Sequence, residues 1–133
     1  AQLNAIRGST AAEKGDFKTA ITYLVKACEE DPKDAQSLNN LAWVYLQTSG
    51  TSLDDALGLV NRAIELKPDF ADYRETRGQI LVRLQKPQEA IADLEYALNG
   101  ITYDSPEIHR GLAEAYTQLG QLEQAAFHRQ QAR

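Results

Sequence analysis

The side chains that most often carry chemistry are few in this sequence, and their spacing argues against a reactive site. Cys28, His109 and His128 form no spacing that is typical of a metal site. Cys28 and His109 fall on the packing stripes of predicted helices, so we expect both to pack. The sequence lacks a phosphate-binding glycine loop, a nucleophile elbow and an HExxH motif. We therefore expect no catalytic residue, no metal site and no cofactor.

The charged residues are numerous but scattered, and they narrow the class of partner. The 133 residues include 19 acidic side chains against 14 Lys and Arg, a formal net charge of −5. Nucleic acids and anionic membranes both favour a basic surface, so this balance argues against either partner. The apolar run Leu41–Leu46 is far shorter than the roughly 20 residues that cross a bilayer, so we expect no direct membrane insertion. The single cysteine excludes an internal disulfide framework and says little about the compartment. We expect a soluble protein, and both the cytoplasm and the periplasm stay open.

A repeating pattern of small and apolar residues organises the whole chain. Alanines recur at equivalent places, namely Ala20, Ala56, Ala90 and Ala125. The spacing of these alanines divides the chain into four repeat units with the ranges 1–34, 35–70, 71–105 and 106–133. Within the units, small and apolar residues are spaced by three and four, which places them on one stripe of a helix.

Glycine and proline mark the ends of the predicted helices. Lys14-Gly15-Asp16 and Leu119-Gly120-Gln121 are turn signals within units, whereas Asp31-Pro32 and Lys67-Pro68 separate units. Each unit is therefore predicted to be two helices joined by a tight turn. The expected helix ranges are 2–14, 18–31, 35–48, 53–66, 71–84, 87–99, 106–119 and 122–132. No strand is expected, and the fold class is all-α, a stack of antiparallel helix pairs.

The pattern resembles the tetratricopeptide repeat, a helix-turn-helix of about 34 residues. Its first-helix signature of a large residue, Leu, a small residue and Tyr matches the stretch Leu38–Tyr45. The matching second-helix residues are Ala56, Val60, Ala63 and Pro68. The resemblance covers essentially the whole chain and implies a right-handed α-solenoid, a single domain over residues 1–133. The sequence is similar to bacterial proteins with several such repeats. The resemblance also implies a non-catalytic role in protein–protein interaction.

Three departures from the repeat concern local packing rather than the fold. The second unit carries a two-residue insertion at its Ser49–Leu53 turn. Asn4 and Arg7 in the first unit, and Arg74 and Arg77 in the third, stand where large apolar residues are usual.

The first helices of such a stack line its concave wall, where a partner is expected to bind. The candidate peptide-binding residues are Gln36, Asn39, Asn40, Trp43, Gln47, Gln79, Arg83, Arg110 and Glu114. In the first unit the same wall carries Gln2, Ala5, Ile6, Ser9 and Glu13. Amide side chains both donate and accept hydrogen bonds, which suits the backbone of an extended peptide.

Two residues of this wall have specific expected roles. The family resemblance implies that Asn40 clamps a peptide main chain, and Trp43 beside it is a candidate aromatic anchor. The whole predicted wall has five carboxylates against two guanidiniums, so the expected partner is a neutral or basic protein or peptide segment. The carboxylates are those of Glu13, Asp72, Glu75, Glu107 and Glu114, and the guanidiniums are those of Arg83 and Arg110.

Simpler interpretations stand beside this one. Asn39 and Asn40 are equally expected as solvated surface residues. Trp43 is a candidate for packing against neighbouring helices. Arg83 and Arg110 are candidates for exposed ion pairs, which contribute little to stability. The alternative is that the two arginines hold a carboxylate of the partner.

The resemblance also bears on one specificity. Tetratricopeptide co-chaperones hold the C-terminal carboxylates of heat-shock chaperones with Lys, Asn and Arg from three first helices. The corresponding residues here are Ala5, Ser9, Asn40, Asp72 and Thr76. Only Asn40 fits, and Asp72 repels a carboxylate, so we expect no binding of such a tail.

Three functions remain open at this point. The first is an adaptor that binds a peptide or protein in its groove. The second is a structural or self-association module whose ends meet other repeats or another copy. The third is a regulatory segment of a larger repeat protein.

Overall fold

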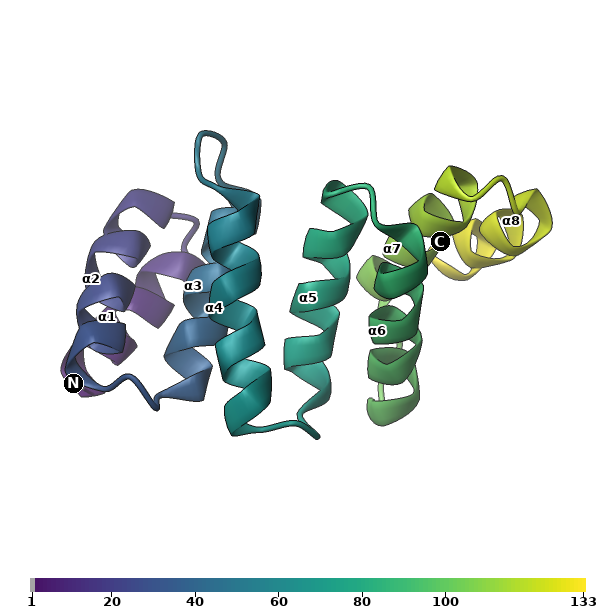
Figure 1. Ribbon diagram of the computed structural model, residues 1–133. Helices are drawn as coiled ribbons and strands as arrows, with labels where there is room; N and C mark the ends of the chain where they lie inside the picture. Colours follow the sequence, from purple (N-terminus) through teal and green to yellow (C-terminus); the bar gives the residue numbers. More distant parts are fainter. Residues whose placement is uncertain (1) are drawn as a thin grey trace. The chain divides into compact units, whose positions relative to one another are not determined.

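The structure, a computed structural model, describes residues 2–133, and these form eight α-helices (Figure 1). The helices are α1 (Gln2–Glu13), α2 (Phe17–Glu30), α3 (Ala35–Gln47), α4 (Leu53–Leu66), α5 (Ala71–Arg83), α6 (Pro87–Gly100), α7 (Pro106–Gln118) and α8 (Leu122–Gln131). Each predicted range agrees with the structure to within one residue at either end. No strand is present within residues 2–133, and the predicted all-α fold of antiparallel helix pairs is confirmed.

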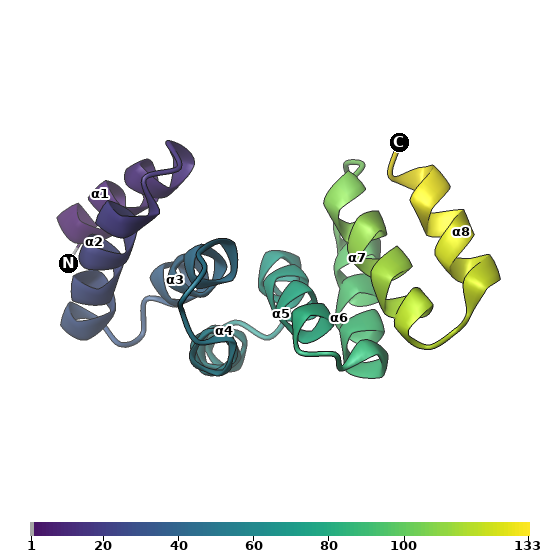
Figure 2. The same cartoon turned by 90° about the horizontal axis from the view of Figure 1, so that it is seen from above.

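The chain divides into two compact units, the first ending at Asp69 and the second spanning Phe70–Arg133. From here on, the first and the second unit are these two compact units and not the four units of the repeat pattern. In the first unit α1 packs on α2, α2 on α3, and α3 on α4. The second unit repeats this order from α5 to α8. Figure 2 shows the helices of each pair lying side by side. The single domain expected over residues 1–133 stays a prediction, and its first residue, Ala1, lies outside the described residues.

One backbone turn recurs between the helices of three pairs. Gly15, Gln85 and Gly120 have φ angles of 79°, 61° and 76°, in the left-handed region. The amide after each of them donates to a carbonyl five residues back, as in Asp16 N to Ala11 O at 2.9 Å. This bond satisfies a carbonyl that the ending helix leaves unpaired. Glycine enters the left-handed region without strain, which is why the sequence places glycine in two of these turns.

Short polar side chains begin the helices that follow turns. Asp16, Asp34, Ser52 and Ser105 each accept a hydrogen bond from the backbone amide three residues later. Each bond satisfies an N–H that the first helical turn leaves unpaired. The helix starts are therefore determined locally.

The repeated alanines form the close contacts of the core. Ala20, Ala56, Ala90 and Ala125 are fully buried. Gly8 allows an equally close approach, because a Cβ there would lie 2.6 Å from Cγ of Leu24. Small residues at these crossings bring the helix backbones together, and leucines fill the space beside them.

An ion pair between a half-buried arginine and a buried aspartate stands in the second unit where the repeat usually has an apolar residue. Arg77 Nε donates to Asp93 Oδ2 at 2.6 Å, and Arg77 Nη2 donates to Asp93 Oδ1 at 2.8 Å. Asp93 is only 5% exposed, and Arg74 Nη1 lies 3.7 Å from its Oδ1. The hydrogen bond to Asp93 raises the pKa of Arg77. The arginines therefore pack by pairing with a carboxylate on the neighbouring helix.

Candidate peptide-binding site

The first unit brings two of the predicted binding residues into one small pocket. Asn40 and Trp43 of α3 line a cavity of about 170 Å³ together with Ser9, Ala12 and Glu13 of α1; we call it the Asn40 pocket. Ser9 and Glu13 lie on the predicted wall. Ala12 was missed, because a small apolar residue in a repeat indicates packing rather than binding.

Asn40 is held in place by two polar neighbours. Its Nδ2 donates to Ser9 Oγ at 3.0 Å, and its Oδ1 accepts from Gln36 Nε2 at 2.9 Å. An amide side chain has two N–H groups and two acceptor positions, so these bonds use half of its capacity. Asn40 is therefore oriented in advance, with hydrogen-bonding capacity beyond these two bonds.

Trp43 both packs and remains accessible. Its ring meets Phe17 of α2 edge-on, with centroids 5.9 Å apart and planes at 74°. The side chain is nevertheless 39% exposed. The Trp43 ring therefore packs against Phe17, as one of the two interpretations expected, and part of its surface stays exposed.

Asn39 does not lie on an exposed wall, which corrects the expectation from the sequence. It is 6% exposed, and its Oδ1 has no hydrogen-bond partner among the described residues. Helix α3 is contacted by α1, α2 and α4, so fewer of its residues face solvent than a two-sided helix pattern predicts. Gln47, at the C-terminal end of α3, is exposed.

In the second unit the predicted residues take part in local contacts. Gln79 Nε2 donates to the carbonyl oxygen of Glu107 at 2.9 Å. Arg110 lies 3.5 Å from the carboxylate of Glu107, and both side chains are largely exposed, as in the ion-pair interpretation. Glu114 accepts a 3.5 Å hydrogen bond from its neighbour one turn along, and Arg83 is exposed. A joint action of these residues with Asn40 and Trp43 stays a prediction.

The carboxylates of the second unit influence one another. Burial raises the pKa of Glu75, and the charges of Asp72 and Glu107 raise it further. Carboxylates that disfavour one another's charge favour a nearby cation. Asp72, Glu75 and Glu107 therefore form a locally acidic group of side chains in the second unit.

The cysteine and the two histidines lie in different units of the chain. Burial raises the pKa of Cys28 to about 11, so its thiol stays protonated at neutral pH. His109 Nδ1 lies 3.0 Å from His128 Nδ1, and the His128 ring stacks on Tyr116. Within residues 2–133 no three His, Cys, Asp or Glu side chains are grouped to hold a metal ion. None of the described helices is long and apolar enough to cross a membrane.

Acidification is expected to destabilise the last helix pair through His128. Burial and the nearby His109 lower the pKa of His128 below its ordinary value of 6.5. The unfolded chain therefore binds a proton at His128 more readily than the folded chain does. The contribution of His128 to the free energy of unfolding is complete above the pKa that this residue has in the unfolded chain, and it is lost as the pH falls toward the pKa in the folded chain. Urea unfolding at about pH 7.5 and about pH 5.5 measures the difference, which His128→Gln should reduce. An unchanged pH dependence in that variant would contradict the assignment.

Sequence models of two families match the chain. One is described as "Anaphase-promoting complex, cyclosome, subunit 3" and matches residues 13–97. The other is described as "Tetratricopeptide repeat" and matches residues 75–129. The two matches overlap and together span most of the chain.

A curated relative and two solved structures agree with these matches. Hsc70-interacting protein 1 of Drosophila melanogaster is 34% identical over 128 residues, which is 96% of this chain and 33% of the relative. The chain thus spans about a third of that relative's length. A thermophilic TPR protein of Thermus thermophilus is 25% identical with a TM-score of 0.75, covering 94% of this chain and 68% of that one.

The other structure is the first TPR of Spaghetti (RPAP3) bound to the HSP90 peptide SRMEEVD. It has a TM-score of 0.78 at 23% identity, covering 90% of this chain and 92% of that one, and shows the fold alone. The repeated helix pairs and the two family matches show that the chain belongs to the tetratricopeptide-repeat family. Repeats of this family are generally protein-interaction modules rather than enzymes.

Proposed function

We propose that this chain is a non-catalytic scaffold that binds a peptide segment of a partner protein along its first helices. The observation that supports this most directly is the Asn40 pocket, where an oriented amide stands beside an accessible tryptophan. The similarity to Hsc70-interacting protein 1 supports the same class of function.

The Asn40 pocket has the size of a side-chain subsite. Its volume of about 170 Å³ lies below the roughly 300–1,000 Å³ of pockets that hold whole small ligands. In the proposed complex Asn40 bonds to the peptide main chain, and one peptide side chain packs against Trp43. Because a flexible peptide must be ordered on binding, we expect weak to moderate affinity.

The charges near the predicted wall favour a neutral or basic peptide. Glu13 contributes a carboxylate to the Asn40 pocket, and Asp72, Glu75 and Glu107 lie together in the second unit. A peptide as acidic as SRMEEVD would face these carboxylates without the Lys and Arg set that the family uses for such tails. The preferred partner segment therefore differs in charge from the peptide in the RPAP3 complex.

Replacing Asn40 and Trp43 together with alanine is expected to weaken peptide binding about tenfold or more, because it removes the main-chain clamp and the aromatic anchor. The probes are fluorescent SRMEEVD and its basic counterpart SRMKKVK, in which lysine replaces each of the three acidic residues. Their affinities are measured by fluorescence anisotropy at low salt. The unchanged chain should prefer SRMKKVK.

The matched control is Tyr23→Ala with Lys26→Ala, an aromatic and a polar residue of α2 outside the Asn40 pocket. This control should bind SRMKKVK as the unchanged chain does, and thermal unfolding should show that both double variants fold. Stronger binding of SRMEEVD, or an equal loss in the control, would refute the proposal.

Self-association is the alternative, and exposed apolar residues in the first and last helices favour it. Leu3 and Ile6 of α1 and Leu122 and Phe127 of α8 are more than half exposed. Sedimentation velocity over a range of concentrations separates the two functions. Self-association would be the better-supported function if the chain forms a dimer that Phe127→Ser disrupts and if it binds neither peptide.

A further inference from the structure

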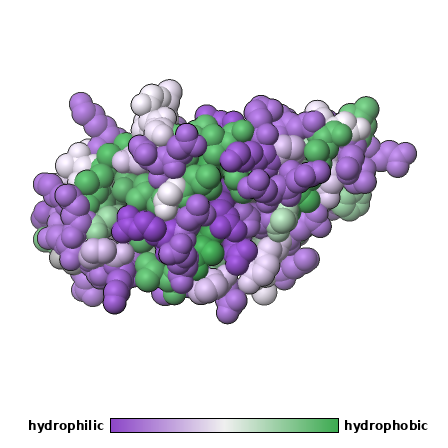
Figure 3. All heavy atoms as spheres, viewed as in Figure 1, coloured by the Kyte–Doolittle hydropathy of each residue, from purple (hydrophilic) through white to green (hydrophobic). Residues whose placement is uncertain are grey.

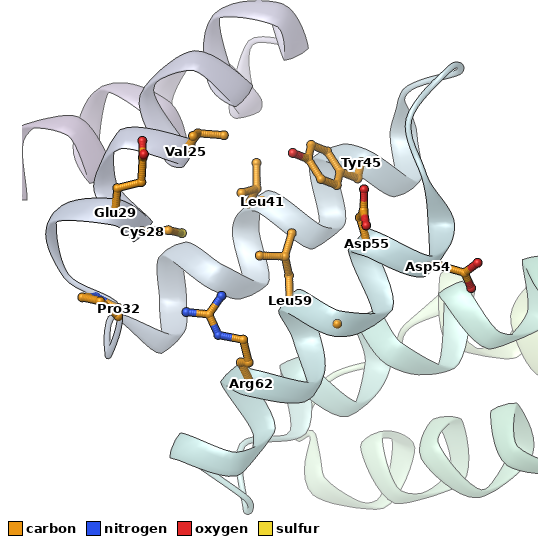
Figure 4. Close-up of a pocket in the computed structure, with 11 residues that line it drawn as sticks. Val25, Cys28, Glu29, Pro32, Leu41, Tyr45, Asp54, Asp55, Leu59 and Arg62 are labelled. Carbon is orange, nitrogen blue, oxygen red and sulfur yellow. The ribbon is translucent and has the colours of Figure 1, made fainter.

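A second and larger cavity lies between α2, α3 and α4, wholly within the first unit (Figure 4). Its volume is about 630 Å³, within the roughly 300–1,000 Å³ of pockets that bind ligands; we call it the α2–α4 cavity. Val25, Cys28, Leu41, Tyr45 and Leu59 give it an apolar lining. Leu41 belongs to the buried core, and the other four are half-buried residues packed on that core. On the face that Figure 3 shows, apolar atoms accordingly gather over the first unit between polar side chains.

The charged residues around this lining are mostly acidic. Glu29, Asp54 and Asp55 contribute three carboxylates, whereas Arg62 contributes one guanidinium, and all four residues are exposed. Burial raises the pKa of Tyr45, and the charge of Asp55 raises it further. The excess of negative charge around an apolar lining favours a ligand that is apolar and cationic at once.

Gly58 provides an independent indication that the α2–α4 cavity is kept open for a partner. It lies in the interior of α4 and lines the cavity. A helix-interior glycine is less stable than alanine by roughly 0.5–1 kcal/mol, so it usually has a packing reason. Gly8 and Gly78 have one, since a Cβ on either would lie 2.6 Å from a leucine Cγ. A Cβ on Gly58 would meet no atom of the described residues within 4 Å.

The other second helices do not have glycine at this position. Two residues after the repeated alanine they have Thr22 in α2, Ala92 in α6 and Phe127 in α8, and all three residues are exposed. The repeat therefore accepts a side chain of any size here and does not require glycine. No contact among the described residues explains Gly58, whereas a partner atom close to the α4 backbone would.

We propose that the α2–α4 cavity is a second docking site, which takes a cationic amphipathic segment of a partner protein. An apolar side chain of that segment lies over Gly58 and Leu59, and an adjacent lysine or arginine faces Asp54 and Asp55. The site is separate from the Asn40 pocket, so this inference goes beyond the proposed function and does not depend on it. Two sites on one unit would let the scaffold hold two partner segments.

The experiment is an NMR titration of the backbone amides with defined probe peptides. The cationic probe has about 14 residues, with leucines spaced by three and four and lysines beside them. Its counterpart has glutamate in place of every lysine. We expect the cationic probe to shift amides of residues that line the α2–α4 cavity, and the acidic probe to shift none of them.

Gly58→Phe is the blocking variant, because it adds a large ring at a residue that lines the α2–α4 cavity and its Cβ meets no atom of the described residues within 4 Å. It should fold and weaken the cationic probe about tenfold or more. Gly58→Ala, which adds only a methyl group, should bind the probe within a few-fold of the unchanged chain and confirms that the helix tolerates a side chain there.

Charge variants test the acidic side of the proposal. Asp54→Asn with Asp55→Asn should weaken the cationic probe several-fold, whereas Glu65→Gln with Asp69→Asn, two exposed acids outside the α2–α4 cavity, should not. Shifts that persist in Gly58→Phe, equal shifts with the acidic probe, or shifts centred on Ser9 and Asn40 would overturn the proposal. A dimer of the chain that Gly58→Phe abolishes would overturn it too, by assigning the cavity to a second copy.

Discussion

Replacing Arg77 with alanine is expected to lower the free energy of unfolding by about 3 kcal/mol, the low end of the range for breaking a buried ion pair. Asp93 would keep its charge at 5% exposure and lose both hydrogen bonds to Arg77. Arg74, whose Nη1 lies 3.7 Å from Asp93, offsets part of this loss. Urea unfolding of the whole chain, followed by circular dichroism, measures the change.

The same unit supplies a matched control in the exposed pair between Arg110 and Glu107. Arg110→Ala should change the free energy of unfolding by less than about 0.5 kcal/mol, because water already solvates both charges. Arg77→Met combined with Asp93→Leu should recover most of the stability, since the buried carboxylate is removed and only Arg74, whose side chain is 25% exposed, loses an ionic contact. Equal effects of Arg77→Ala and Arg110→Ala would mean that Asp93 is not buried as the structure has it.

Alanine at two helical glycines should change stability in opposite directions. Gly78→Ala is expected to lower the free energy of unfolding by about 1–3 kcal/mol, because the new Cβ would lie 2.6 Å from Cγ of Leu94 and force α5 and α6 apart. Gly58→Ala should raise it by about 0.5–1 kcal/mol, because the methyl group meets no atom of the described residues and alanine favours the helix. Denaturant midpoints of both variants, measured side by side, test the pair.

Both glycine-to-alanine substitutions gain the same helix propensity, so this gain cancels when the two variants are compared. Both substitutions place alanine in a helix interior, so the difference between them reports mainly the contacts of the new Cβ at residue 78 with Leu94 and with the carbonyl oxygen of Ala90. Two variants that shift stability in the same direction would show that the crossing of α5 and α6 is looser than the structure has it. Destabilisation by Gly58→Ala alone would show that α4 is packed at a position where the structure leaves it open.

The sequence by itself determined the helices, because their signals are local. Alanines spaced by three and four mark each packing stripe, and residues such as Gly15 and Asp16 end one helix and begin the next within a few positions. For the same reason Asn40 and Trp43 were predicted on one side of α3, and the structure places both in the Asn40 pocket. That this pocket binds a peptide remains a proposal.

Only the tertiary structure decided which residues meet across helices. Arg77 in an apolar position had no local explanation, because its partner Asp93 lies on the next helix. Asn39 has the same residue type as Asn40 and neighbours it, yet α3 buries one and leaves the other accessible. The α2–α4 cavity and the open space at Gly58 depend on the separation of three helices. Periodicity states which side of a helix packs, but the distance to its neighbours is determined by how all the side chains between them fit together.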